Sequence, residues 1–503
     1  MSLLILCSCS LWAAAGCDGS GNCYVRSGAA GSNNGADWTN AFKDLPASLT
    51  RGVTYYVAAG TYKGHQFSDP DSGTTLITIQ AATVANHGTS TGFNNSFVGQ
   101  AVFNTNINNT GTIFIFSTDY YVINGVYRST ASGQPQTDWT LESGYGFKVD
   151  NSGKVACAAV VDLGDLNGAP VHDITVEYAD INGSHETSAT GCREDGFHSV
   201  YGSYNVTAKF NYIHDTGLTI LYVKGNHQGT AGFGPGTNVS FTYNYFARDF
   251  SEPTQHAEGC SCSEGLTNFT IAYNYWQDIN GTAVIATPSG GGYNSGNGNN
   301  GNWLIYGNVA FESSCSAVTS NGRNAGVAGF FYDFDTTFNG PLYILNNTIY
   351  NFPASCNSDS GIMLGDGANP VPMTSVFVQN NLWSQAAQVS IQNNCPTSGG
   401  RATCTSITWD HNAYFASPDN SGSKDSDPNK QVSSLNPFVN SASFIFQLAS
   451  DTAAGVNTNA TLAANGQDLL GTTRGSDGLW DRGAFQISGT KPGIPPGTQA
   501  TAR

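Results

Sequence analysis

The middle of this chain repeats one phrase, which reads Asn205-Val-Thr-Ala-Lys-Phe-Asn211, Asn238-Val-Ser-Phe-Thr-Tyr-Asn244 and Asn268-Phe-Thr-Ile-Ala-Tyr-Asn274. Weaker copies end at Asn308, Asn347, Asn381 and Asn412, and successive final asparagines are 33, 30, 34, 39, 34 and 31 residues apart. A repeat of this length is typical of a solenoid or a propeller. Each unit contains two or three short strand-like segments instead of the four of a propeller blade. We therefore predict an all-β fold, a right-handed single-stranded parallel β-helix.

The phrase itself predicts which side chains face the core. Alternation places Val206, Ala208 and Phe210 inward and Thr207 and Lys209 outward. Asparagine tolerates the left-handed backbone of a tight bend, and stacked asparagine side chains can hydrogen-bond to one another along the coils. The asparagines are thus explained by structure. Aromatic residues that recur at fixed repeat positions are expected to form stacking rows; they are Tyr212, Tyr245, Tyr275 and Trp276.

The composition limits the partners. The 503 residues have a formal net charge of −17, only 11% charged residues and 60 glycines, and no basic patch is present. Nucleic acid is excluded as a partner because nothing offsets the repulsion of phosphate. A polyanionic substrate is disfavoured unless cations bridge it to the protein. An acidic surface also keeps an exported protein soluble.

The two ends of the chain differ from the repeat. Residues 1–15 have an apolar core followed by small residues, as in a secretory signal peptide, although no positive charge lies near Met1. Lipid attachment at Cys17 is the alternative. Residues 22–487 are assigned to the β-helix and 488–503 to a flexible tail. No other apolar run is long enough to span a membrane. We expect a protein that is secreted or held at the cell surface, and we expect it to be a monomer.

Ten cysteines follow the signal, an even number that suits disulfides in an oxidising compartment. Cys17 with Cys23, and Cys395 with Cys404, close short loops and are the pairs we propose, while the connectivity of the other six stays open. The Cys260-Ser-Cys262 spacing lacks a second ligand pair, so a structural role is favoured over metal binding.

Both ends of the β-helix resemble a known family. The segments Asn33-Asn-Gly35, Trp38 and Tyr55-Tyr-Val-Ala-Ala-Gly-Thr-Tyr62 look like the entry of pectate-lyase-like parallel β-helix proteins. Gly475-Ser-Asp-Gly-Leu-Trp-Asp-Arg-Gly-Ala-Phe485 is similar to the closing segment of bacterial members. The resemblance covers residues 22 to 487 and implies the fold. It does not imply one chemistry, because the superfamily includes lyases, hydrolases, epimerases and non-catalytic surface proteins.

The repeat provides a ruler for locating a site. Asp195 and Glu258 each lie 16 residues before a final asparagine, Asp366 lies 15 before and Asp333 lies 14 before. The ruler therefore places several acids and histidines on one face of the solenoid. The candidate catalytic residues are Asp195, His198, Lys224, His256, Glu258 and Asp333. The alternative for each acid alone is a solvated turn residue or a cap.

Two chemistries fit these residues. In a polysaccharide lyase, His198, His256 or Lys224 would remove the proton beside a uronate carboxylate, and carboxylates would hold Ca²⁺ to offset substrate charge. The superfamily's lyases commonly use Lys or Arg with calcium, and the candidate calcium ligands are Asp333, Asp335 and Asp366. In a glycoside hydrolase, two of the carboxylates would act as acid and as base or nucleophile. We favour the lyase acting on an extracellular polysaccharide; a non-catalytic surface or adhesive β-helix remains the third hypothesis.

Overall fold

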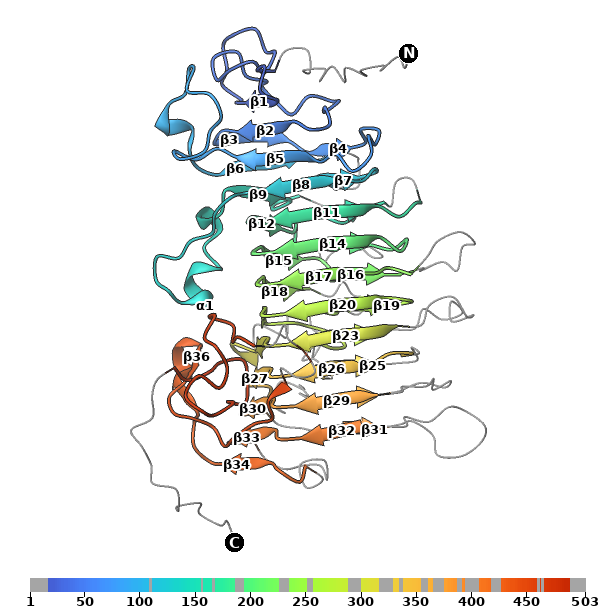
Figure 1. The fold of residues 1–503 in the computed structure, drawn as a ribbon, viewed down its shortest axis with the longest axis vertical. Coiled ribbons are helices and arrows are strands. Elements are labelled where there is room, and N and C mark those ends of the chain that lie inside the picture. Colours follow the sequence, from blue (N-terminus) through green and yellow to red (C-terminus); the bar gives the residue numbers. More distant parts are fainter. Residues whose placement is uncertain are drawn as a thin grey trace, which may run out of the picture.

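The computed structural model of the chain is almost entirely β. It describes residues 17–107, 111–154, 157–164, 168–185, 194–225, 235–250, 257–287, 300–315, 329–333, 338–353, 361–364, 375–386, 391–393, 407–417, 427–458, 462 and 466–488. Three long parallel sheets run the length of the molecule (Figure 1). From β2 to β31 each coil contributes one strand to each sheet in the order A, B, C, and the next coil begins again in sheet A. This architecture confirms the predicted parallel β-helix.

Sheet A holds the strands that precede the repeat asparagines. They are β1 (Asn22–Val25), β2 (Thr54–Val57), β5 (Ile77–Ala81), β8 (Tyr121–Asn124), β11 (His172–Glu177), β14 (Tyr204–Lys209), β17 (Val239–Thr242), β20 (Thr267–Ala272), β23 (Gly301–Tyr306), β26 (Leu342–Leu345), β29 (Val376–Gln379) and β32 (Ile407–Asp410).

Sheet B holds the strands that follow those asparagines. They are β3 (Gly60–Lys63), β6 (Ala101–Thr105), β9 (Phe147–Asp150), β12 (Ala179–Asn182), β15 (Tyr212–Thr216), β18 (Tyr245–Asp249), β21 (Tyr275–Gln277), β24 (Val309–Phe311), β27 (Thr348–Tyr350), β30 (Leu382–Ser384), β33 (Ala413–Phe415) and β34 (Gln431–Ser433).

Sheet C closes each coil. Its strands are β4 (His65–Phe67), β7 (Phe114–Phe116), β10 (Val161–Leu163), β13 (Phe197–Ser199), β16 (Leu221–Lys224), β19 (Cys260–Ser263), β22 (Ile285–Thr287), β25 (Phe331–Asp333), β28 (Ile362–Leu364) and β31 (Ile391–Asn393). Aliphatic and aromatic residues from all three sheets fill the interior as one continuous cluster. Burial of the inward apolar side chains of all three sheets is what stabilises this arrangement.

The repeat asparagines form the expected ladder at the bend between sheets A and B. The Asn211 amide Nδ2 donates to Asn244 Oδ1 at 3.2 Å, and Asn244 donates in the same way to Asn274 at 3.1 Å. The row continues to Asn412, whose Nδ2 donates to the Asp427 carboxylate at 3.1 Å. Each of these asparagines is buried, so the ladder satisfies polar groups that would otherwise be costly.

Two details of the predicted bend are wrong. The left-handed residue is not the ladder asparagine but the one before it, since Phe210 and Tyr243 have φ of 60° and 56°. Phe210 therefore leaves the alternation and does not face the core; its ring is half-buried and stacks between Tyr178 and Tyr243. The inward prediction holds for Val206 and Ala208, which belong to the central cluster.

Two segments outside the coils cover the outer face of sheet B. One is the excursion from Val126 to Gly146, which carries α1 (Pro135–Asp138) and η2 (Glu142–Gly144). The other is the chain after β34, with the antiparallel pair β35 (Phe438–Asn440) and β36 (Ile445–Leu448) joined by η6 (Ser441–Ser443). They bury the tyrosine row, in which Tyr245 and Tyr275 are stacked with ring centroids 5.3 Å apart. A further short helix, η1 (Asn95–Phe97), lies in the N-terminal part.

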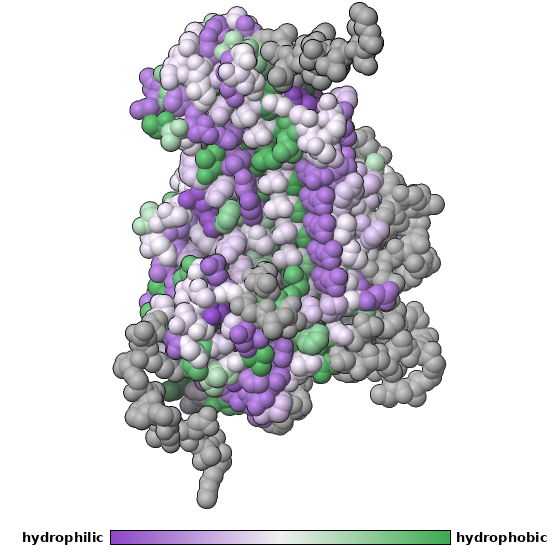
Figure 2. Space-filling model, in the orientation of Figure 1, coloured by the Kyte–Doolittle hydropathy of each residue, from purple (hydrophilic) through white to green (hydrophobic). Residues whose placement is uncertain are grey.

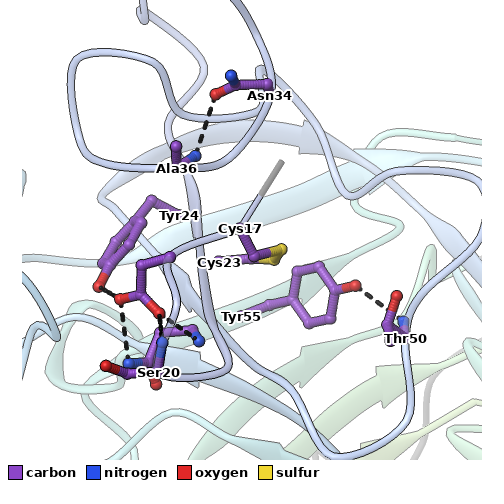
Figure 3. The surroundings of a disulfide bond; sticks show 10 residues. Cys17, Ser20, Cys23, Tyr24, Asn34, Ala36, Thr50 and Tyr55 are labelled. Carbon is purple, nitrogen blue, oxygen red and sulfur yellow. Dashed lines mark hydrogen bonds between the residues drawn. A yellow bond between two sulfur atoms is a disulfide. The ribbon is translucent and has the colours of Figure 1, made fainter. Parts of the chain in front are cut away.

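The N-terminal coil is fastened by the predicted Cys17–Cys23 disulfide (Figure 3). Beside it the Tyr24 hydroxyl donates to the Asp18 carboxylate at 2.7 Å, and the Thr50 backbone N–H donates to the Tyr55 hydroxyl at 2.9 Å. Cys395, Cys404, residues 1–15 and all but the first residue of the 488–503 tail lie outside the described part. Among the described residues, no helix is long and apolar enough to cross a membrane.

Figure 2 shows a hydrophilic stripe that crosses successive coils, parallel to the long axis of the molecule. Sheet A contributes a second, exposed row of asparagines, Asn205, Asn238, Asn268 and Asn302, joined by side-chain hydrogen bonds of 3.0 to 3.1 Å. The first residue of each repeat phrase thus forms a ladder as well, on the outside of the solenoid.

Candidate active site

The outer face of sheet C carries a column of polar side chains on adjacent coils. Strand register aligns Asp162, His198, Tyr222 and Ser261, and neighbouring strands lie about 4.8 Å apart. His198 Nδ1 lies 3.2 Å from Asp162 Oδ1, and its ring stacks on Tyr222 with centroids 5.3 Å apart. Sequence analysis identified His198 but missed Asp162 and Tyr222, because only the register shows that they are neighbours.

Lys224 lies two residues beyond Tyr222 on β16 and so points to the same side. Its Nζ donates to Ser263 Oγ at 2.8 Å and lies 5.0 Å from the centre of the Tyr222 ring. The residue is only 2% exposed. Burial lowers the pKa of the Lys224 ammonium to about 8. A sizeable fraction of this amine is therefore neutral just above neutral pH.

Carboxylates surround Lys224 without removing this effect. Glu264, Glu258 and Asp195 each act to raise the pKa of Lys224, and burial outweighs them. Asp195 lies two residues before β13, and Glu258 lies two residues before β19. Because Phe197 aligns with Leu221 and Leu221 with Cys260, the two carboxylates come from the coils on either side of the Lys224 coil. The structure thus brings together four predicted site residues: Asp195, His198, Lys224 and Glu258.

Glu194 precedes Asp195 but belongs to the bend between sheets B and C. Its carboxylate accepts hydrogen bonds from the Ser184 N–H at 2.8 Å and the Gly217 N–H at 3.0 Å. Burial raises the pKa of Glu194 to about 7, and these hydrogen bonds limit the rise. Glu194 ties two coils together just behind Asp195, which is a positioning role.

Asp333 does not share the face with Lys224. It aligns with Thr287, and both alternate to the same side as Ile285 and Phe331 of the central cluster. The Thr287 hydroxyl donates to its carboxylate, which is fully buried. Of the predicted calcium ligands, only Asp333 is described, so the described residues do not complete that ligand set. Asp335, Asp366 and His256 lie outside the described part.

Cys260 and Cys262 are also on the inward side, where they are bonded to each other. This agrees with the predicted structural role. Elsewhere, one group of three acids among the described residues has ligand atoms within 4.8 Å of one another, Asp451, Asp477 and Asp481. The Asp481 carboxylate already accepts hydrogen bonds from Thr452 and Gln486, so it serves the C-terminal segment.

The Lys224 site contains the parts that proton transfer requires. It has an amine whose pKa of about 8 lies near working pH, an imidazole oriented by a carboxylate, and two flanking carboxylates. Beyond Ser261 the same outer column continues as Ala286, Tyr332 and Met363, which pack together with Ala283. The column changes from polar to apolar along the solenoid.

The sequence matches no protein-family model, and it matches no curated protein. Solved structures that share the architecture include the pectate lyase Pel9A (16% identity, TM-score 0.42, 95% of this chain and 92% of that one). Others are XylC in complex with xylose (9%, 0.39, 93% and 98%) and an alginate lyase from Paenibacillus sp. (12%, 0.36, 76% and 92%). The three parallel sheets of stacked coils identify the fold as a parallel β-helix. These similarities do not identify a reaction, which has to be inferred from the residues of the candidate site.

Proposed function

We propose that this protein is an exported polysaccharide lyase that cleaves a uronate-containing glycan by β-elimination at the outer face of sheet C. The observation that carries the proposal is Lys224, a buried amine with a pKa near 8 whose hydrogen-bond partner is a hydroxyl and not a carboxylate. Secretion, an extracellular substrate and a monomeric state belong to the same proposal.

In the proposed reaction, neutral Lys224 Nζ takes the proton from the carbon next to the uronate carboxyl group. The electron pair of that C–H bond forms the ring double bond as the neighbouring glycosidic C–O bond breaks. The leaving oxygen needs a proton, and His198 is the candidate donor because Asp162 orients its ring on the same face. Lys224 ends protonated and His198 neutral, so a proton must pass between site and solvent before the next turnover.

The charges of the site favour a cation in this proposal. Asp195, Glu258 and Glu264 would repel a uronate carboxylate unless a positive charge lies between them. Carboxylate oxygens are the ligands that Ca²⁺ prefers, and Asp195 and Glu258 would hold it here. Calcium would supply charge neutralisation of the substrate, and we expect a chelator to reduce activity.

A glycoside hydrolase is the second candidate, because Asp195 and Glu258 flank the coil of Lys224. Two inter-strand steps put their backbones about 9 to 10 Å apart. Carboxyl groups at the lower end of this spacing fall within the range of about 6.5 to 9.5 Å that suits inversion with a water between them. In this alternative Lys224 would orient the carboxylates and would not act as a base.

One screen separates these proposals. The protein is incubated with polygalacturonate, alginate and neutral glucans and xylans, with and without a chelator, while ultraviolet absorbance and reducing ends are followed together. Unsaturated product that is lost in Lys224→Gln supports the lyase. Reducing ends without absorbance, lost in Glu258→Gln, support the hydrolase. Silence on every glycan, with binding retained, would favour the non-catalytic surface protein. Lys209→Gln is the matched control, because Lys209 pairs with Glu177 on the outer face of sheet A.

A further inference from the structure

One pocket of the described residues lies away from sheet C. A pocket of about 350 Å³ forms where the excursion from Val126 to Gly146 meets the C-terminal segment at Leu469–Gly471. In Figure 1 α1 and the C-terminal segment lie on the left, whereas β16 and β19 of the candidate active site are labelled towards the right. The volume is within the range of small-ligand sites. Its lining includes Arg128, Asp138, Trp139, Tyr243 and Leu470.

Arg128 is the cation of this pocket. Its Nη1 donates to the Tyr243 carbonyl oxygen, and the guanidinium carbon lies 3.6 Å from the centre of a Trp139 ring. Among the described residues, no carboxylate lies within ion-pair distance of Arg128. Burial lowers the pKa of Arg128 to about 10, so the group remains charged at neutral pH. A fixed guanidinium without an acidic partner is unusual in a chain with a net charge of −17.

The one acid in the lining is already engaged. Asp138 accepts hydrogen bonds from the backbone N–H groups of Ser132 at 2.9 Å and Gly133 at 2.8 Å, which fold the excursion back on itself. These bonds lower the pKa of Asp138 against the opposing effect of burial. Asp138 is 4% exposed; its charge acts to raise the pKa of Arg128, but its carboxylate is not within ion-pair distance of the guanidinium.

The rest of the lining is aromatic or aliphatic. Tyr243 is half-buried within a stack that runs from Phe210 to Tyr273, with ring centroids 5.4 and 4.9 Å from Tyr243. Leu470 on the opposite wall is 45% exposed. Apolar walls with one guanidinium match a ring that has apolar C–H faces and a single carboxylate, because Arg binds carboxylate through two parallel N–H···O bonds.

We propose that this pocket is a non-catalytic binding site for a carboxylate-bearing sugar, with Arg128 as the specificity-determining residue. The site lies at the bend between sheets A and B, so a glycan held there would leave the outer face of sheet C open to a second segment of glycan. The proposal does not depend on catalysis at Lys224, because binding to the Arg128 pocket would persist in a chain that cleaves nothing.

The test uses the full chain carrying Lys224→Gln, so that no substrate is consumed. The protein is labelled with 5-fluorotryptophan, and the ¹⁹F resonance of Trp139 is assigned by its loss in Trp139→Phe. We expect trigalacturonate to shift this resonance in a saturable way, and neutral galactotriose to bind at least tenfold more weakly. Arg128→Met should weaken trigalacturonate binding at least tenfold, and Arg128→Lys, which keeps the charge but not the fork, should weaken it less.

Two results would overturn the proposal: no shift of the Trp139 resonance with trigalacturonate up to millimolar concentration, or equal shifts with both trisaccharides. Because Arg128 packs on Trp139, thermal unfolding of Arg128→Met is measured alongside. If that variant is unfolded, the affinity of Arg128→Lys for trigalacturonate tests the proposal in its place. The screen for unsaturated product is independent of this resonance, so failure of the lyase proposal and failure of this one are told apart.

Discussion

Two lysines on the outside of this solenoid, Lys148 partly buried and Lys224 fully buried, differ in the direction of their pKa shifts. Lys148 lies on β9 of sheet B, and its Nζ is 2.6 Å from the Glu142 carboxylate and 3.5 Å from that of Asp180. Lys224 lies on β16 of sheet C and donates to the Ser263 hydroxyl. Burial alone would lower the pKa of both. The neighbouring carboxylates reverse that effect and raise the pKa of Lys148, whereas the pKa of Lys224 falls to about 8.

The charged residues around Lys148 form ion pairs that link neighbouring coils of the scaffold. His214 Nε2 lies 2.7 Å from Asp180 and its Nδ1 lies 2.6 Å from Asp215, while Arg248 binds both oxygens of Asp215 at 2.7 Å. Each charge thus has a neighbour of opposite sign on the same or an adjacent coil. A lysine that is paired directly with carboxylates stays charged and serves the scaffold. A buried lysine without such an ion pair can change its protonation state.

The largest effect should come from removing the Lys224 amine. Lys224→Gln is expected to lower the rate of appearance of unsaturated product by about 10³-fold, within the range for loss of a general base. Lys148→Gln should leave the rate per folded molecule within about threefold, because Lys148 lies on another sheet. Initial rates of ultraviolet absorbance on an active polysaccharide measure both. Equal losses in the two variants would mean that Lys224 acts through the scaffold.

Stability should respond to the same pair of lysines with opposite sign. Lys148→Met removes one of the two cations beside the fully buried Asp180, leaves His214 as the other, and should destabilise the fold by about 3 kcal/mol. Lys224→Met removes an amine whose pKa is lowered from 10.5 to about 8 in the folded state. That shift corresponds to a loss of up to about 3 kcal/mol from the free energy of unfolding at pH 7. We expect Lys224→Met to unfold at the same or higher denaturant concentration than the parent, whereas Lys148→Met unfolds at a lower one. A destabilised Lys224→Met would contradict the difference in pairing on which the comparison rests.

The sequence was sufficient for the fold and for half of the site. The asparagine spacing marks the coils because a buried amide ladder needs the same residue at the same point of each coil, as Asn211 and Asn244 show. The same ruler found Asp195 and Glu258. It misplaced Asp333, because inward or outward direction changes with every residue along a strand. Asp162 and Tyr222 have no distinguishing motif, and their place beside His198 depends on strand register.

The pH dependence should separate the two regions again. With Lys224 as base, kcat/KM should rise about tenfold per pH unit and level off near pH 8. The folded state favours the neutral form of Lys224. The amine therefore destabilises the fold below pH 8, and this destabilisation disappears between pH 8 and 10.5.

His214 should give the opposite slope. Burial would lower the pKa of His214, but the Asp180 and Asp215 carboxylates outweigh burial and raise it. Its stabilising contribution is therefore complete below about pH 6.5 and is lost as pH rises through the higher pKa of the folded state. Thermal midpoints against pH should show this slope in the parent and not in His214→Asn. An unchanged slope in that variant would assign it to another group.

The smallest effect should come from Ser263, the hydrogen-bond partner of Lys224. Ser263→Ala removes an acceptor worth about 1 kcal/mol, so the rate should fall by about fivefold and not by the 10³-fold expected for Lys224→Gln. Loss of this acceptor also makes the ammonium less favourable, which should move the alkaline plateau of the pH profile to lower pH. A structural role for Ser263 would change the rate without moving the profile. Ser263→Thr keeps the hydroxyl and should restore the parent profile, because what the site requires at this position is an acceptor without a charge.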